Sequence, residues 1–105
     1  MTKDGRKVVF ISGPVTGKDD YYKAFDAAEW ELARQGHVVL NPAILPADLP
    51  DASYMPICIA MLEQSDAVYV LKGWRESAGA RTEVAYAERQ GKIVIYEEDD
   101  KNAES

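Results

Sequence analysis

Four short runs of apolar, mostly β-branched residues alternate with stretches of helical spacing, and this alternation most constrains the fold. The runs occupy residues 7–12, 37–41, 67–71 and 93–96. Near-continuous apolar runs of this length, several of them ended by Gly or Pro, are typical of buried parallel strands. Because strand, helix and strand follow one another at crossover spacing over residues 7–41, the first two strands are expected to form a parallel pair through a right-handed crossover. The pattern therefore predicts an α/β fold whose sheet of four or five parallel strands has helices on both faces.

The stretches between these runs predict three helices and one long loop. The first helix is expected between the aspartates at 19–20 and the Gln-Gly pair at 35–36. A short second helix is predicted over residues 55–63, with a proline near its start, and a third over residues 80–90. Residues 42–54 carry three prolines and little periodicity, so they are predicted to form a long loop.

Length and composition limit the domain organisation. A chain of 105 residues, 47% hydrophobic and 29% charged, suits one α/β domain over residues 1–105. Its ordered core is expected at about residues 7–97, followed by a polar, acidic tail at 98–105. No apolar run approaches the roughly 20 residues that span a bilayer, and no secretory signal is evident. A cytoplasmic protein without membrane partners is therefore expected, which also suits its single cysteine, Cys58.

The charge of the chain limits its partners. The net charge of −6 argues against binding a nucleic acid polymer, because that requires a basic face that releases counterions from phosphates. A small anionic ligand is compatible with this charge, because backbone N–H groups at a helix N-terminus can hold one phosphate. Ligands of parallel sheets bind beyond the carboxyl ends of the strands, so the loops that follow the predicted strands are the candidate ligand-binding segments.

The loop after the first strand reads Ser-Gly-Pro-Val-Thr-Gly-Lys at residues 12–18. Its two glycines can present backbone N–H groups to an anion near a helix start. A true P-loop is not predicted, because the loop is one residue short and Asp19 replaces the magnesium-binding Ser or Thr. A plain strand-to-helix turn that needs glycine is an equal alternative. The candidate ligand contacts in this loop are Ser12, Gly13, Pro14, Thr16 and Gly17.

A second loop and helix start, at residues 73–83, are richer in functional side chains. Ser77 is a candidate N-cap or phosphate donor, and Gly79 would let a ligand approach the backbone. Glu83 falls in the first turns of the helix, whose positive end would keep its carboxylate ionised. An ionised carboxylate beside a bound sugar is the nucleophile that glycosyl transfer needs. The alternative, favoured by spacing alone, is that Glu83 only complements the helix dipole.

Two further residues at predicted strand ends are candidate ligand contacts. Asn41 closes the second strand and is followed by the long loop. Trp74 follows the third strand and either stacks on a base or packs beside the sheet edge.

No cysteine or acidic cluster surrounds His37, so no metal site is predicted.

Four segments together carry a resemblance to a known family. They read ISGPVTG at 11–17, GHVVLNP at 36–42, SDAVYVL at 65–71 and GWRESAGARTE at 73–83. The chain resembles the nucleoside 2-deoxyribosyltransferase-like superfamily, in particular a short, uncharacterised phage and bacterial branch related to the nucleoside monophosphate N-glycosidases. The similarity extends from Val8 to about Tyr96, and the four segments together are fairly specific.

The resemblance implies a flavodoxin- or Rossmann-like three-layer sandwich that assembles into homodimers or higher homo-oligomers. It also implies cleavage of the N-glycosidic bond of a nucleoside or nucleotide through a glutamate nucleophile, with no metal or organic cofactor. Glu83 matches that glutamate. Ser77 stands where monophosphate hydrolases carry serine and the transferases carry aspartate. The expected activity is thus N-glycosidase action on a (deoxy)ribonucleoside 5′-monophosphate, or deoxyribosyl transfer between bases.

Two positions depart from the pattern of the active relatives. Cys58 stands where they carry an aspartate that assists protonation of the leaving base, and Phe10 stands where they carry a tyrosine that orients the nucleophile. A thiol with an ordinary pKa of about 8.5 is a poor general acid, and phenylalanine has no hydroxyl. The alternative function is a non-catalytic module that binds a nucleotide or nucleotide-sugar. The candidate auxiliary residues are Tyr21, Tyr22, Tyr54, Cys58 and Asp66.

Overall fold

A computed structural model describes residues 1–15 and 20–97 of the chain. Within these ranges four strands form one sheet, namely β1 (Val8–Ser12), β2 (Val38–Leu40), β3 (Ala67–Val70) and β4 (Ile93–Tyr96). The α-helices are α1 (Tyr21–Arg34), α2 (Asp51–Glu63) and α3 (Ala78–Arg89), and the short 3₁₀ turns are η1 (Pro42–Ile44) and η2 (Trp74–Glu76). None of the described helices is both long and apolar enough to cross a membrane.

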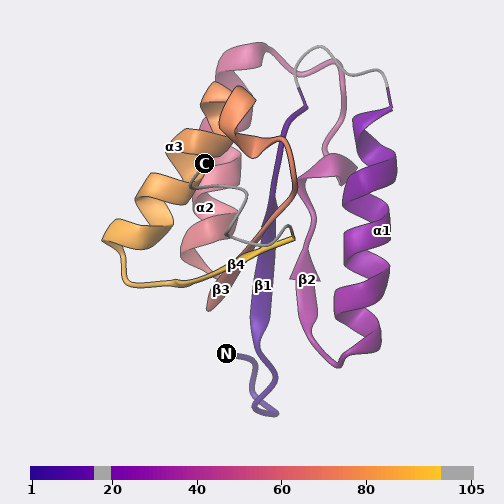
Figure 1. The fold of residues 1–105 in the computed structure, drawn as a ribbon, viewed down its shortest axis with the longest axis vertical. Helices are drawn as coiled ribbons and strands as arrows, with labels where there is room; N and C mark the ends of the chain where they lie inside the picture. Colours follow the sequence, from indigo (N-terminus) through magenta and orange to yellow (C-terminus); the bar gives the residue numbers. More distant parts are fainter. Residues whose placement is uncertain (16–19, 98–105) are drawn as a thin grey trace.

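All strand pairs are parallel, and the strand order is β2-β1-β3-β4. This is the order of a flavodoxin-like sheet, in which the chain changes direction between β1 and β3. Figure 1 shows α1 on one side of the sheet, with α2 and α3 together on the other. The structure therefore confirms the predicted α/β sandwich and gives the sheet four strands within the described residues.

Two apolar cores lie on the two faces of the sheet because successive side chains of a strand point in opposite directions. On one face Ile11 of β1 packs in a buried cluster with Phe25 and Leu32 of α1. On the other face Phe10 packs in a cluster with residues of both α2 and α3, among them Leu62. Burial of each such large side chain contributes roughly 1.5–3 kcal/mol, so these two clusters hold the helices on the sheet.

The structure corrects the prediction for residues 42–54. They are not one long loop, because η1 occupies 42–44 and α2 begins at Asp51. Pro56 consequently lies inside a 13-residue helix and not near its start. The helix tolerates this because Pro56 and Ala52, whose carbonyl lacks the usual i+4 donor, are both exposed to water. Burial of Cys58 and Leu62 against the sheet holds the helix together.

The third helix begins two residues earlier than predicted. Ser77 is its N-cap, as the sequence had suggested, and the Ser77 Oγ accepts a hydrogen bond of 3.2 Å from the backbone N–H of Ala80. Gly79 therefore lies in the first turn of α3 and not in a loop. Glu83 lies in the second turn, where its side chain faces the sheet.

A pair of glycine substitutions tests how the loop after β1 packs. A Cβ at Gly13 would lie 2.8 Å from Cδ1 and 2.9 Å from Cβ of Leu71, whereas one at Gly79 would lie 3.5 Å from Met55 Cε. We expect Gly13→Ala to lower the free energy of unfolding by about 1–3 kcal/mol through overpacking. Gly79→Ala should instead raise it by up to about 1 kcal/mol, because alanine favours a helix. Urea unfolding measures both values, and an unchanged midpoint for Gly13→Ala would contradict this loop packing.

Candidate active site

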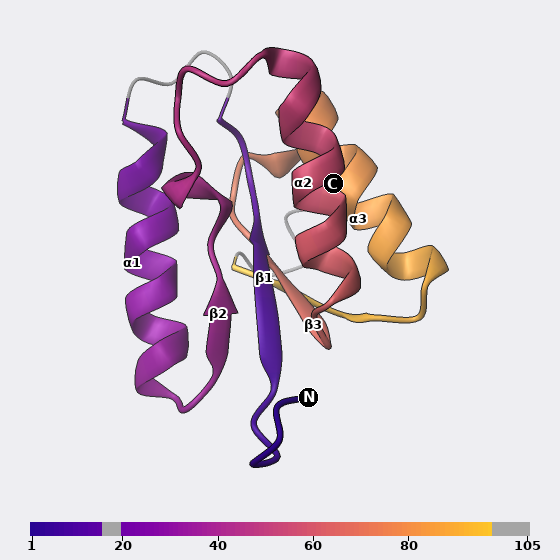
Figure 2. The same ribbon diagram turned by 180° about the vertical axis from the view of Figure 1, so that it is seen from behind.

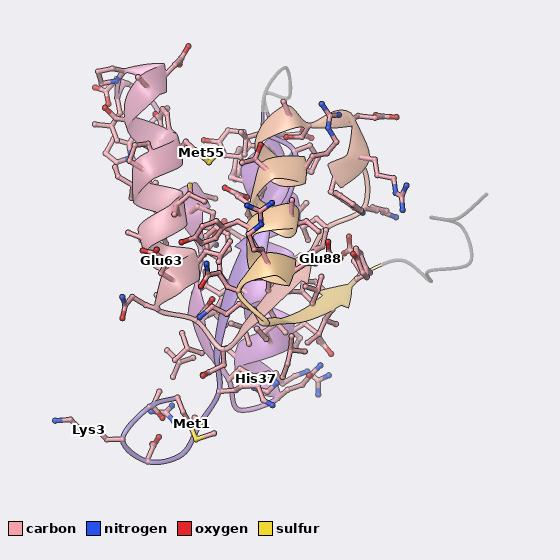
Figure 3. The ribbon with its side chains drawn as sticks, turned by 90° about the vertical axis from the view of Figure 1, so that its left-hand side faces the viewer. Met1, Lys3, His37, Met55, Glu63 and Glu88 are labelled. Atoms are coloured by element: carbon pink, nitrogen blue, oxygen red, sulfur yellow. The ribbon has the colours of Figure 1, made fainter. Side chains whose placement is uncertain are left out.

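The candidate site lies at the carboxyl edge of the sheet, between β1 and β3. Both α2 and α3 begin at this edge (Figure 2). Figure 3 shows Met55, near the start of α2, close to the first turns of α3, whereas Met1 and His37 lie at the opposite edge. The strand order changes direction between β1 and β3, and this is the position at which open parallel sheets bind their ligands.

Three different elements bring polar side chains together at this edge. Glu83 reaches inward from α3 and is only 7% exposed. The hydroxyl of Ser12, the last residue of β1, donates a hydrogen bond of 2.6 Å to Oε1 of Glu83. The thiol of Cys58, from α2, is close enough to the Glu83 carboxyl to act on its pKa as a weak donor. A buried carboxyl with two neutral donors therefore forms the centre of the site.

Burial determines the protonation of this carboxyl. It raises the pKa of Glu83 to about 7, against the smaller lowering effect of the hydrogen bonds from Ser12 and Cys58. The expectation that the helix dipole keeps Glu83 ionised is therefore wrong. The side chain lies in the second turn and points into the protein, where loss of water outweighs the dipole. Near neutral pH the carboxyl is present in both protonation states.

The thiol beside Glu83 stays protonated. Burial, and then the neighbouring charge and hydrogen bond of Glu83, raise the pKa of Cys58 to about 12. Phe10 is fully buried in the same apolar cluster as Cys58. Both residues therefore lie on the face of the sheet from which Glu83 approaches.

The residues predicted around α3 have structural partners of their own. Ser77 caps the helix, and Gly79 lies in its first turn. The Trp74 ring packs 5.7 Å from the ring of Tyr96, and the guanidinium of Arg75 lies 5.0 Å from the Trp74 ring centroid. This geometry matches the packing alternative for Trp74, which joins the buried cluster beneath α3.

The loop after β1 packs closely against the end of β3. Gly13 approaches Leu71, and Pro14 Cγ is 3.6 Å from the position of a Cβ at Gly73. The backbone N–H of Leu71 also donates to the Ser12 carbonyl at 2.8 Å. Two of the predicted ligand contacts in this loop lie outside the described residues, namely Thr16 and Gly17.

Asn41, predicted as a ligand contact, is 3% exposed and joins the chain after β2 to α1. Its amide nitrogen donates to Asp26 at 3.1 Å and to Glu29 at 2.8 Å. Its Oδ1 accepts a hydrogen bond of 2.9 Å from the backbone N–H of Ala43, which caps η1. In this conformation both the nitrogen and the oxygen of the Asn41 amide are hydrogen-bonded within the protein, so the side chain holds the segment after β2 against α1.

The three tyrosines considered as auxiliaries lie in different surroundings. Tyr21 is half-buried and makes edge-to-face contacts with Tyr22 and Phe25. Tyr22 is 47% exposed. The Tyr54 hydroxyl donates to the carbonyl of Pro46, which precedes α2. None of these three hydroxyls is hydrogen-bonded to Glu83 in the described part of the chain.

Asp66 lies away from Glu83, because it precedes β3 and so stands at the opposite, amino edge of the sheet. Its carboxylate accepts a hydrogen bond of 2.8 Å from the backbone N–H of Val8 and pairs with the amino group of Met1 at 2.8 Å. The structure thus does not bring Asp66 to the candidate site. Within residues 1–15 and 20–97, no group of three or more His, Cys, Asp or Glu side chains could hold a metal ion.

A cavity of about 310 Å³ opens on the α1 side of the same edge, across the sheet from α3. Small-molecule sites begin at about 300 Å³, so its size suits part of a nucleotide. Lys23 and Glu97 were not predicted as site residues, although Glu97 directly follows the last strand and so stands where ligands of parallel sheets bind. The cavity is lined by Pro14, Asp20, Tyr21, Lys23, Ala24, Leu71, Lys72 and Glu97.

Comparison with known proteins identifies one family and no curated relative. No curated protein matches this chain. A family model with the description "Domain of unknown function (DUF4406)" matches residues 7–96, a range that contains all the described strands and helices and the Ser12, Cys58 and Glu83 cluster. Because the match covers most of the sequence, the chain belongs to this family, the domain of unknown function DUF4406.

Proposed function

We propose that this protein hydrolyses the N-glycosidic bond of a (deoxy)ribonucleoside 5′-monophosphate, with Glu83 as the nucleophile. The observation that carries the proposal is the buried Glu83 carboxyl at the ligand-binding edge of the sheet, held by Ser12 and Cys58. The resemblance to the nucleoside 2-deoxyribosyltransferase-like superfamily supports it, because Glu83 matches the glutamate that attacks the sugar there.

In this reaction a carboxylate oxygen of Glu83 forms a bond to C1′ of the sugar while the bond from C1′ to the base nitrogen breaks. The base leaves with the bonding electrons and takes up a proton. Water then attacks C1′, releases the sugar phosphate, and returns Glu83 as a carboxylate. If a second base attacks in place of water, the same intermediate leads to base exchange, which is the transferase variant.

The 5′-phosphate has candidate partners at the same edge. The Ser77 Oγ accepts from the Ala80 N–H, and its own hydroxyl hydrogen can donate to a phosphate oxygen. The backbone N–H group of Gly79, in the first turn of α3, is a further candidate donor to the phosphate. Lys23 and Lys72 are among the residues that line the cavity on the other face of the sheet, together with the acidic residues Asp20 and Glu97. The donors among these groups favour a monophosphate over an uncharged nucleoside.

The test is to incubate the protein with a panel of ribo- and deoxyribonucleoside 5′-monophosphates and their parent nucleosides, following free base by chromatography. We expect base from at least one monophosphate and less from its nucleoside. A second free base added to the mixture separates hydrolysis from transfer. If no member of the panel releases base, the glycosidase proposal is wrong.

The pH dependence of the reaction follows from the protonation of Glu83. Only the carboxylate attacks, and its pKa is about 7. We therefore expect kcat/KM to rise about tenfold per pH unit below pH 7 and to level off above it, because kcat/KM follows the ionisation of the free enzyme. Stopped assays at low nucleotide concentration between pH 5 and 9 measure this profile. A kcat/KM that falls through pH 7 would instead show that the protonated carboxyl is the active form.

A second candidate function is a module that binds a nucleotide without cleaving it. The observation that favours it is that the thiol beside Glu83, Cys58, stays protonated and is a weak proton donor to a leaving base, while Phe10 of the same face has no proton to give. In this role Glu83 accepts hydrogen bonds from ribose hydroxyls. Calorimetry that detects nucleotide binding, together with a lack of base release in the panel, would favour this function.

A further inference from the structure

The Glu83 carboxyl is held in place by an uncharged group on a strand. The donor is the Ser12 hydroxyl, 2.6 Å from Oε1, and both side chains are buried. A bond of this length is typical of a hydroxyl that donates to a carboxylate. Within residues 1–15 and 20–97 the ion pairs involve other residues, so no salt bridge competes with Ser12 for the Glu83 carboxyl.

We propose that Ser12 is the positioning residue of this site, whose hydroxyl orients the Glu83 carboxyl toward the sugar. The inference rests on the proposed function and adds to it a role for a residue that the sequence had suggested only as a ligand contact. Ser12 is fully buried and its hydroxyl faces Glu83. The side chain therefore acts through Glu83 and not on the ligand.

The backbone at Ser12 is rigid enough for this role. Ser12 is the last residue of β1 and is in register with Val70 of β3. Its carbonyl accepts a hydrogen bond of 2.8 Å from the N–H of Leu71. The β2 pairing of β1 ends at Phe10, so at Ser12 it is the pairing with β3 that fixes the backbone from which the side chain projects. The Ser12 hydroxyl is thus a hydrogen-bond donor held in a fixed position relative to Glu83.

The carboxyl, in contrast, depends on side-chain contacts for its orientation. Glu83 has three rotatable side-chain bonds, and packing of Ala80, Val84 and Ala87 holds the α3 backbone but not the carboxyl itself. Phe10 lies two residues before Ser12 on the same face of β1 but has no hydroxyl to offer. Ser12 is therefore the oxygen donor from β1 that reaches Glu83.

The first test measures the pKa of Glu83 without substrate, by NMR titration of its side-chain carboxyl. Ser12→Ala removes a hydrogen bond that favours the charged form, so the midpoint should move above the wild-type value of about 7. Cys58 is the titratable group that contacts this carboxyl, and with a pKa of about 12 it stays protonated throughout. An unchanged midpoint would overturn the proposal.

Ser65 provides the matched control. It is also a buried serine, 2% exposed, and its Oγ donates to the carbonyl of Leu62 at 2.6 Å. Ser65→Ala should lower stability as Ser12→Ala does, but leave the Glu83 midpoint and kcat unchanged. If both variants move the midpoint equally, the effect is general loosening of the fold and the positioning role is wrong.

The second test uses turnover. Ser12→Ala should lower kcat by about 10- to 100-fold with little change in KM, and should move the pH profile upward with the carboxyl midpoint. Ser12→Thr, which keeps the hydroxyl, should recover most of both. Ser12→Cys keeps nearly the same volume with a weaker donor and should lie between, which decides the case if Ser12→Ala does not fold. A Ser12→Cys variant identical to wild type would count against the proposal.

The two proposals fail in different ways. If the wild-type protein releases no base, the glycosidase function is wrong, while the NMR titration still decides whether Ser12 orients Glu83. If base is released but Ser12→Ala keeps the wild-type midpoint and kcat, Ser12 does not position the carboxyl and the glycosidase function remains.

Discussion

Replacing Glu83 with glutamine should lower base release by a factor on the order of 10⁴ or more, because the amide cannot form the glycosyl bond. Glutamine has nearly the same size, and its side-chain oxygen can still accept the hydrogen bond from Ser12. The loss should therefore appear in kcat, with binding of the monophosphate largely retained. Chromatography of free base and calorimetry of binding, on the same preparation, measure the two effects.

Glu88 offers a matched control for this substitution. It lies on the same helix (Figure 3), and its side chain is exposed to water. Glu88→Gln makes the same change of charge and should keep kcat within about twofold of wild type. A Glu83→Gln variant that retains more than a tenth of wild-type turnover would rule out Glu83 as the nucleophile.

The same substitution should stabilise the fold at alkaline pH. Burial raises the pKa of Glu83 from an ordinary 4.5 to about 7 in the folded state. The folded protein therefore holds this proton more tightly than the unfolded chain does. Its contribution to stability is complete below pH 4.5 and is lost as the pH rises through 7. A shift of this size corresponds to about 3 kcal/mol.

We expect Glu83→Gln and wild type to have similar unfolding free energies at pH 5. At pH 8.5 the variant should be more stable by up to about 3 kcal/mol, because it buries no charge. Urea unfolding at the two pH values measures the difference, and Glu88→Gln should show none. Equal pH dependence in Glu83→Gln and wild type would mean that the carboxyl is not buried as the structure shows. The expected gain is typical of functional groups, which are retained at a cost in stability.

Much of the fold could be predicted because the relevant signals are local. A parallel strand that is buried on both faces appears as an apolar run, which is why the sequence located β1 at 8–12 within about one residue. The edge strand at 93–96 was located from its β-branched run, although Ile93 and Ile95 are exposed. The N-cap at Ser77 was also predictable, because its hydroxyl binds a backbone group three residues away. Neither feature requires knowledge of distant residues.

The second helix shows the limit of such local signals. Its three nearby prolines and weak periodicity predicted a loop, yet α2 begins at Asp51 and contains Pro56. Packing of Cys58 and Leu62 on the sheet holds this helix, and that packing involves strands far away in the sequence. Tertiary contacts here override the local preference of the chain.

By itself, the sequence determined the alternation of strands and helices, the carboxyl edge as the region of interest, and Glu83 as its central residue. Only the tertiary structure decided the hydrogen-bond partners and the protonation of Glu83. Ser12 and Glu83 are 71 positions apart in the sequence. They meet because α3 packs on the face of the sheet toward which the Ser12 side chain of β1 points. The raised pKa of Glu83 follows from this burial, and burial depends on the elements that surround a residue, not on its neighbours in the sequence.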